Sequence, residues 1–295
     1  AGSVSHTIGL LGISPVNIQK GIRWNSAFAY LDNVRDDSNL TILGDVLANK
    51  VNFSNGRAVS LNVVIDGDLI DIAVGRIVLC AGTYESPTIL LRSGIGSPAL
   101  LSDLDIKTAV DLPGVGRNLH DHPSTSLKFI GNRQLSDGME ESLANGNTVF
   151  TEQSLAKVAS DKCTKAFDMH ISPVTEANPN TDGLWPFSIA ISNMAPKSRG
   201  RLFIRNDDPT ERPVIDTGYL TDPEDSDISV LLEGISLARQ ISSQLPLSAL
   251  IEKEILPSKN LINASAVRRT SLHYYHPVGT CKMGLANDPM AVVDN

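Results

Sequence analysis

The sequence is poor in cysteine and has no long apolar run. Its three cysteines, Cys80, Cys163 and Cys281, are scattered and odd in number, so they predict neither a disulfide framework nor a zinc site. A helix that crosses a bilayer needs about 20 consecutive apolar residues, and the 295 residues contain no such run. These absences argue against a disulfide-stapled scaffold and against a helical membrane span within this sequence.

An excess of positive charge is also lacking. The formal net charge is -8 and the sequence pI is about 5.2, which argues against nucleic acid or an anionic membrane surface as the main partner. The sequence lacks the G-x-G-x-x-G fingerprint of dinucleotide-binding proteins. Hydrophobic residues make up 41% and charged residues 20%, which is typical of a globular protein with one or two domains. The sequence gives no signal for the cellular location or the oligomeric state.

The first quarter of the chain predicts a helix followed by a β-meander. Trp24, Phe28 and Leu31 repeat at helical spacing and predict a helix over residues 17–32. Asn55-Gly56 is a tight-turn signal between two strand-like runs. Strands are therefore expected at residues 39–43, 50–53, 58–65 and 69–74.

A strand, a small-residue turn and a helix are expected next. Residues 77–79 form a short apolar run that suits a strand buried on both faces. Ser86 can cap the following helix, Pro87 fits its first turn, and Gly94 can end it. Phosphate or ribose groups bind at such helix N-termini. An ordinary strand–helix junction without a ligand stays open as the alternative.

The second half predicts an antiparallel sheet that carries one helix layer. Asp, Asn and Pro mark turns between strand-like runs. One apolar stripe, with acids in its first turn, predicts a helix over residues 223–244. The strands are expected at residues 126–130, 166–171, 187–194 and 201–205.

The chemistry that can be read from residues alone centres on His276. Imidazole is the side chain that titrates near neutral pH, so it can take a proton and pass it on. Pro277 stiffens the backbone beside it, and Gly279 permits a sharp bend. A histidine on a rigid turn suits a general base; a hydrogen-bonded loop residue is the other interpretation.

A glycine-rich loop over residues 112–123 contains the pair His120 and His122. Such a pair could bind a metal, but the sequence nearby supplies no cysteine or third histidine. Asp121 could simply orient one of the histidines. We predict no metal site.

Three separated stretches resemble the glucose-methanol-choline (GMC) flavoprotein oxidoreductases. Residues 82–96 resemble the family's second signature, with Gly-Thr-x-x-Ser-Pro, two aliphatics and Ser-Gly-Ile-Gly. Residues 276–284, His-Pro-Val-Gly-Thr-Cys-Lys-Met-Gly, resemble its active-site histidine loop, and residues 113–122 match a third stretch. Order and intervals agree across nearly the whole chain.

The resemblance implies an α+β fold in which part of an FAD-binding α/β domain joins a substrate domain with an antiparallel sheet backed by helices. It implies FAD, a small-molecule alcohol substrate, and His276 as the base that takes the hydroxyl proton while hydride moves to flavin N5. By position, Ala81, Gly82 and Thr83 would approach the adenosine side of FAD, and Ala48 would contact adenine. The expected segments are residues 1–123 for the cofactor, 124–260 for the substrate, and 261–295 as a return to the cofactor domain.

Two features of the family pattern are missing from this sequence. The dinucleotide-binding fingerprint and the family's final active-site segment do not appear, so we expect the middle and late portion of such an enzyme. Two other functions stay open: an FAD-containing hydroxynitrile lyase, and a non-catalytic fragment that binds no cofactor. The sequence does not identify the substrate or the electron acceptor.

Overall fold

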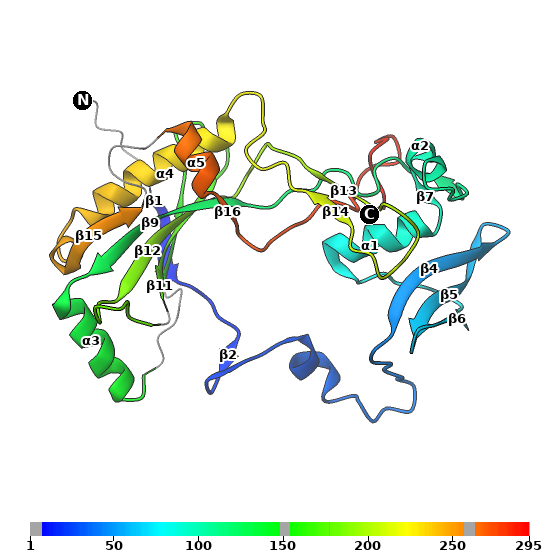
Figure 1. The fold of residues 1–295 in the computed structure, drawn as a ribbon, viewed down its shortest axis with the longest axis horizontal. Coiled ribbons are helices and arrows are strands. Elements are labelled where there is room, and N and C mark those ends of the chain that lie inside the picture. The colour runs from blue at the N-terminus through cyan, green and yellow to red at the C-terminus, as the bar shows by residue number, and fades with distance from the viewer. Residues whose placement is uncertain (1–7, 148–153, 177, 257–262, 295) are drawn as a thin grey trace. The chain divides into compact units, whose positions relative to one another are not determined.

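The computed structural model describes residues 8–147, 154–176, 178–256 and 263–294. Its contacts divide the chain into two compact units, each built from three segments. Unit 1 comprises residues 1–30, 122–197 and 220–276, and unit 2 comprises residues 31–121, 198–219 and 277–295. Figure 1 shows the elements of each unit. The mixed α and β architecture confirms the expected fold class. The expected cofactor and substrate segments stay a prediction, because contacts do not report what a segment binds.

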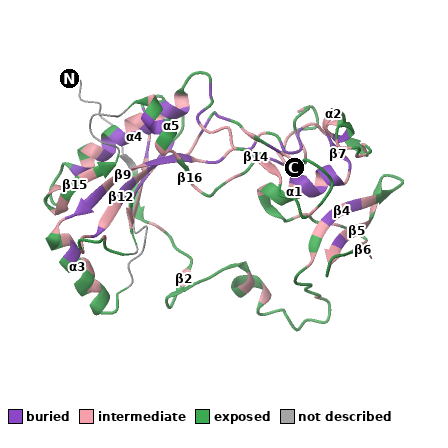
Figure 2. Ribbon diagram, viewed as in Figure 1, coloured by how far each residue is buried: buried purple, intermediate pink, exposed green. Residues whose placement is uncertain are grey.

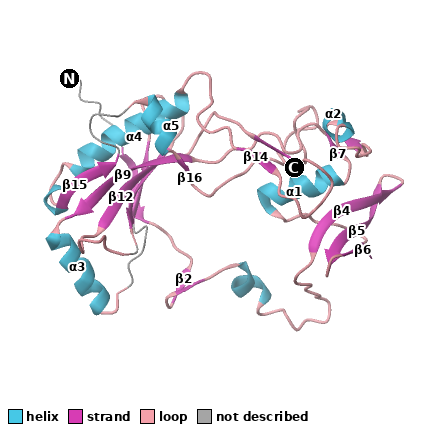
Figure 3. Ribbon diagram, viewed as in Figure 1, coloured by secondary structure: helices cyan, strands magenta, loops and turns pink. Residues whose placement is uncertain are grey.

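Unit 1 is built on an antiparallel sheet of seven strands among the described residues (Figure 3). The strand order is β1-β10-β11-β12-β9-β15, and β16 also pairs with β9. The strands are β1 (Ile8–Ile13), β9 (Pro123–Gly131), β10 (Ser154–Val158), β11 (Met169–Thr175), β12 (Pro186–Asn193), β15 (Ile251–Leu256) and β16 (Leu272–His273). The helices are α3 (Arg133–Ala144), α4 (Ser226–Ser242), the 3-10 turn Leu247–Leu250 and α5 (Ala264–Thr270).

The two faces of this sheet differ in chemistry because side chains alternate along each strand. Met169 and Ile191 lie on one face, where a Cβ placed on Gly234 of α4 would touch both of them. That face is the core of the unit, and its buried residues on β9 and β12 include Leu127, Phe129 and Ile189. Figure 2 shows buried stretches on both strands. His170 and Ser192 are paired across β11 and β12 and point to the opposite face. The sheet therefore has an apolar face under α4 and a polar face opposite it.

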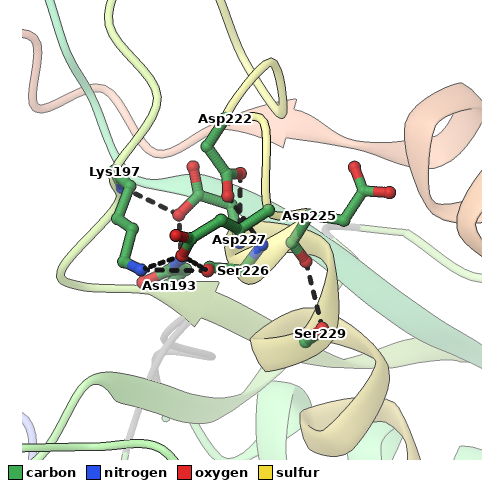
Figure 4. Close-up of polar contacts among 8 residues, drawn as sticks. Asn193, Lys197, Asp222, Asp225, Ser226, Asp227 and Ser229 are labelled. Atoms are coloured by element: carbon green, nitrogen blue, oxygen red, sulfur yellow. Dashed lines mark hydrogen bonds and ion pairs between the residues drawn. The ribbon is translucent and has the colours of Figure 1, made fainter.

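Helix α4 is fixed at its N-terminus by a network of carboxylates (Figure 4). The Asp222 carboxylate accepts from the backbone N–H groups of Ser226 (2.6 Å) and Asp227 (3.2 Å). Buried Asp227 accepts from Asn193 Nδ2 at 3.1 Å and from the Lys197 backbone N–H at 2.8 Å. Acceptors at a helix N-terminus satisfy its free N–H groups. The network ties α4 to the end of β12.

Unit 2 packs a β-meander against one helix. Arg92, near the end of α1, is buried and donates from Nε to the Asn49 carbonyl in β4 at 3.0 Å. A hydrophobic core cluster of unit 2 contains Leu91, Leu101, Val115 and Ile204. The elements are β4 (Leu47–Ser54), β5 (Arg57–Ile65), β6 (Asp68–Ala73), α1 (Gly82–Arg92), β7 (Ile95–Gly96), α2 (Pro98–Ser102), β8 (Val110–Asp111), β13 (Arg201–Phe203) and β14 (Val214–Asp216).

The structure confirms the predicted meander and the predicted helix at α4. It also confirms the strands expected near β9, β12 and β13. The prediction of a helix over residues 17–32 is wrong. Strands β2 (Ile18–Gln19) and β3 (Ile22–Arg23) form a hairpin there, and a short π-helix, Ala27–Leu31, follows. Gly21 between the strands has a φ of 76°, which a right-handed helix does not allow.

Four further expectations are corrected. Residues 39–43 and 77–79 are not strands, and Val78 is 76% exposed; an apolar strand needs partners for its backbone, and the described residues place none beside it. Helix α1 begins at Gly82 instead of near Ser86, so Pro87 lies inside it. The strand expected at residues 166–171 is Met169–Thr175. The sequence analysis did not predict β1, α3, β10, β15, α5 or β16.

Gly234 tests the close packing of α4 on the sheet. A Cβ at Gly234 would lie 2.4 Å from Ile191 Cγ2 and 3.1 Å from Met169 Sδ. We expect Gly234→Ala to lower the free energy of unfolding by about 1–3 kcal/mol, since a well-packed core resists added volume. Gly138→Ala in α3 is the control, because a Cβ there meets nothing within 4 Å; alanine should be neutral or stabilise by up to about 1 kcal/mol. Urea unfolding measures both, and an unchanged Gly234→Ala midpoint would contradict the packing argument.

Candidate active site

Helix α1 and the loop after His276 are joined by two hydrogen bonds within unit 2. Thr83 Oγ1 donates to the Pro277 carbonyl at 2.6 Å, and Thr280 Oγ1 donates to the Thr83 carbonyl at 2.6 Å. Thr280 is 1% exposed. Each threonine therefore holds the other's segment, across nearly 200 positions of sequence.

Pro87 explains why the Thr83 carbonyl is available. In a regular helix, the N–H of the residue at position 87 would donate to that carbonyl, four residues earlier. Proline has no N–H, so it removes this bond. Pro87 lies inside α1, and the Thr280 hydroxyl takes the place of the missing donor.

The stretch over residues 113–122 runs beside the histidine loop. His120 and Val278 exchange both backbone hydrogen bonds, at 3.0 and 2.9 Å, and the Gly116 N–H donates to the Thr280 carbonyl at 2.9 Å. Gly279 has a φ of 100°, and a Cβ there would lie 2.2 Å from the Asn118 carbonyl oxygen. The predicted sharp bend at Gly279 is confirmed. All three stretches that carry the family resemblance contribute residues to this part of unit 2.

The residues expected to approach a cofactor lie on two elements of unit 2. Ala81 is the N-cap residue of α1, and its methyl group cannot accept a hydrogen bond from the first helical turn. Gly82 is exposed and has a φ of 78° with open space around its Cβ position. Thr83 is half-buried and bonded to the histidine loop. Ala48 lies on β4, where its carbonyl accepts from Arg92 Nη2 at 3.5 Å.

In unit 1, His276 belongs to a cluster of rings. Its exposed imidazole centroid lies 5.1 Å from that of Tyr274 and 5.9 Å from that of His122. His122 and Tyr274 are themselves 6.2 Å apart in an edge-on arrangement. His122 directly precedes β9, and Tyr274 follows β16, which pairs with β9. The pairing of β16 with β9 therefore brings the three rings together.

A second group of rings extends this cluster along the sheet. His170 of β11 lies 6.4 Å from Tyr274 and stacks on Phe167 at 5.5 Å with an interplanar angle of 17°. Burial lowers the pKa of His170 to about 4, and the charges of Lys157, His122 and His276 act in the same direction. His170 is therefore neutral at pH 7.

His120 is followed in unit 2 by a buried carboxylate. Asp121 is 6% exposed and accepts from the Tyr219 hydroxyl at 2.8 Å. Burial and this bond raise the pKa of Tyr219, and burial together with the Asp121 charge raises the pKa of Tyr84. The Nδ1 atom of His120 lies 2.7 Å from the Asn118 carbonyl oxygen. Within the described ranges, no group of three or more His, Cys, Asp or Glu side chains is arranged to hold a metal ion.

Sequence reasoning placed His276 on its loop but missed the rings around it. The sequence pattern indicates His122 only through the His120–His122 pair, and it does not indicate His170, Phe167 or Lys157. One available signal was strand alternation, because His170 lies between Met169 and Ile171 and so points away from their face. The contact with Tyr274 depends on β16, which the sequence did not predict.

The chain matches the GMC oxidoreductase family over two regions. Its residues 4–124 match the N-terminal part of the family and residues 196–295 match the C-terminal part. The two matched regions contain 121 and 100 residues, and together they make up more than half of the 295 residues of the chain. The chain belongs to the GMC oxidoreductase family.

Curated relatives include an alcohol dehydrogenase [acceptor] of Pseudomonas putida, 29% identical over 96% of this chain. An oxygen-dependent choline dehydrogenase of Sinorhizobium fredii is 31% identical over 96% of the chain. In both comparisons the match covers 55% of the relative, so the chain spans about half the length of these relatives.

The solved structures agree with this assignment. Pyridoxine 4-oxidase from Mesorbium loti superposes with a TM-score of 0.80 at 28% identity, over 96% of this chain and 56% of that one. Formate oxidase gives a TM-score of 0.74 at 21% identity, over 88% of this chain and 54% of that one, a likeness of fold alone. None of the described helices combines the length and hydropathy of a membrane span.

The bond from Thr280 to Thr83 predicts a specific double-mutant result. Thr280→Val leaves the Thr83 carbonyl without its donor, and we expect a loss of about 1–3 kcal/mol in unfolding free energy. Pro87→Ala supplies an N–H for the same carbonyl, so it should recover part of that loss in the Thr280→Val background. Urea unfolding of the four proteins gives the coupling energy. Exposed Thr41→Val is the control, and strictly additive effects would contradict this account.

The depressed pKa of His170 predicts a pH dependence of stability. The unfolded chain binds the His170 proton near pH 6.5 and the folded chain near pH 4. The unfolded state therefore holds more protons between these values, and folding stability falls as pH drops from about 6.5 to about 4. In His170→Gln, the free energy of unfolding measured with urea should fall less over this pH window. In His273→Gln, which changes an exposed histidine, it should fall as much as in the parent. Equal falls in all three proteins would contradict the assignment.

Proposed function

We propose that the protein containing this chain is an FAD-dependent oxidoreductase that oxidises an alcohol, with His276 as the general base. Membership of the GMC oxidoreductase family supports the reaction class. Relatives named as alcohol dehydrogenase and choline oxidase support an alcohol as the substrate. The observation that carries the role of His276 is its exposed imidazole on a loop whose next residue, Pro277, is anchored to Thr83.

The proposed step removes two hydrogens from the alcohol carbon and its hydroxyl group. His276 takes the hydroxyl proton, and the C–O bond becomes a carbonyl as hydride leaves the same carbon. When bound, the flavin supplies the hydride acceptor. A base contributes only within hydrogen-bond reach of its proton. The Thr83–Pro277 bond and the bend at Gly279 fix the backbone that follows His276.

The N-terminus of α1 suits the binding of an anionic or polar cofactor group. Ala81 leaves the first-turn N–H groups without a side-chain acceptor, and Gly82 is exposed with open space above it. N–H groups at a helix N-terminus, with the positive end of the helix dipole, attract such groups. Ala81, Gly82 and Thr83 would hold this end of FAD, and Ala48 would contact its adenine. Two structural relatives name FAD in their descriptions, a formate oxidase of Aspergillus oryzae and a Chaetomium thermophilum oxidoreductase.

Rapid mixing of the intact flavoprotein with an alcohol tests the role of His276. We expect His276→Ala to slow flavin reduction by roughly 10²–10⁴-fold, the usual contribution of a positioned base. His273→Ala is the matched control, because His273 is also an exposed histidine, three residues away on β16. Its rate should stay close to that of the parent.

Two results would contradict the proposal. An unchanged reduction rate in His276→Ala would remove this histidine from the role of base. A flavin that stays oxidised with a broad panel of alcohols would remove the oxidation itself.

A further inference from the structure

The polar face of the unit 1 sheet carries a continuous row of side chains next to the ring cluster. Lys157 pairs with His170, His170 with Ser192, and Ser192 with Ser124, across β10, β11, β12 and β9. Ser192 Oγ donates to Ser124 Oγ at 3.0 Å, and Ser124 Oγ to the Ile191 carbonyl at 3.0 Å. Both serine hydroxyls thus have acceptors within the sheet, and Lys157 and His170 are the other two members of the row.

The Lys157 ammonium lies over an aromatic ring. Its Nζ lies 4.9 Å from the centroid of Phe167, within the range of a cation–π interaction. Phe167 in turn stacks on His170, and His170 meets the edge of Tyr274. Tyr274 lies 5.1 Å from His276. One chain of contacts within unit 1 therefore leads from this ammonium to the proposed base.

His170 brings unused hydrogen-bonding capacity to the row. Both of its ring nitrogens are buried, and neither has a hydrogen-bond partner in the described chain. A buried polar group without a partner is costly, and a ligand that entered the ring cluster could supply the partner. The groups whose positive charge lowers the pKa of His170 are Lys157 of β10, His122 before β9 and His276 after β16. All of them are basic.

We propose that Lys157 and His170 form a subsite for an anionic group, such as a carboxylate, at the end of the alcohol substrate remote from the oxidised carbon. The ammonium of Lys157 supplies the charge, and neutral His170 supplies one hydrogen-bond donor. This inference rests on the proposed function and names its substrate class. It sets this chain apart from its choline-oxidising relatives, because choline carries a quaternary ammonium that Lys157 would repel.

Matched substrates test the charge preference in the full-length flavoprotein. One series consists of ω-hydroxy carboxylates, and the other of ω-hydroxyalkyl trimethylammonium ions, of which choline is the first member. Neutral primary alcohols of equal length that end in a tert-butyl group are the reference. We expect kcat/KM for the carboxylate to exceed that for the ammonium ion by about tenfold or more at the best chain length, since the Lys157 ammonium attracts the carboxylate and repels the ammonium ion.

Lys157→Met tests whether Lys157 is the source of that preference. Methionine keeps an unbranched chain of similar length and removes the charge. The ratio of kcat/KM for the carboxylate to that for the neutral alcohol should fall about tenfold, mainly through KM. Lys253→Met on exposed β15 is the control, and its ratio should equal that of the parent. A purely structural role for Lys157 would change all three series equally, and that result would overturn the proposal.

Equilibrium binding separates this inference from the proposed function. Isothermal titration with unreactive carboxylates and alkyl trimethylammonium ions needs no turnover. If no alcohol reduces the flavin but carboxylates bind and Lys157→Met weakens them, the proposed oxidation fails and the subsite stands. If alcohols reduce the flavin while ammonium ions bind or react as well as carboxylates, the oxidation stands and the subsite is overturned.

Discussion

The hydrogen bond from the Thr280 hydroxyl to the Thr83 carbonyl is the constraint on which the proposed site depends. Pro87 withholds the N–H that would satisfy this carbonyl within helix α1, so a residue nearly 200 positions later supplies the donor. The return bond from Thr83 to the Pro277 carbonyl closes the pair. The bond is partly buried, and a carbonyl that loses its donor away from water costs more than an ordinary hydrogen bond gains. The pair therefore specifies where the loop after His276 must lie.

The two faces of the unit 1 sheet differ in their side chains. Its apolar face is buried beneath α4, where Gly234 allows the helix to approach Met169 and Ile191 closely. Its opposite face holds polar and ring side chains that a hydrophobic core does not need. Strand alternation makes this division automatic, since each strand serves both faces. The proposed subsite of Lys157 and His170 therefore lies on the face turned away from the packing of α4.

Sequence patterns predicted the elements whose signals are local. The Asn55-Gly56 turn gave the meander, and the apolar stripe gave α4. The helix expected at residues 17–32 failed because three spaced apolar residues did not outweigh the turn at Gly21. Residues 77–79 carry the composition of a buried strand, but strand formation requires partners that sequence does not specify. His276 was found through its motif, whereas the contact of His170 with Tyr274 depends on the pairing of β16 with β9, which leaves no local signal.

The most direct measurement of the central claim is a crystal structure of the intact flavoprotein with an unreactive alcohol analogue bound. The account predicts a ring nitrogen of His276 within hydrogen-bond reach of the analogue's hydroxyl oxygen, about 2.6–3.2 Å, with the Thr83–Pro277 and Thr280–Thr83 bonds retained. A His276 ring turned away from that oxygen, with another side chain of the protein in contact with it, would contradict the account.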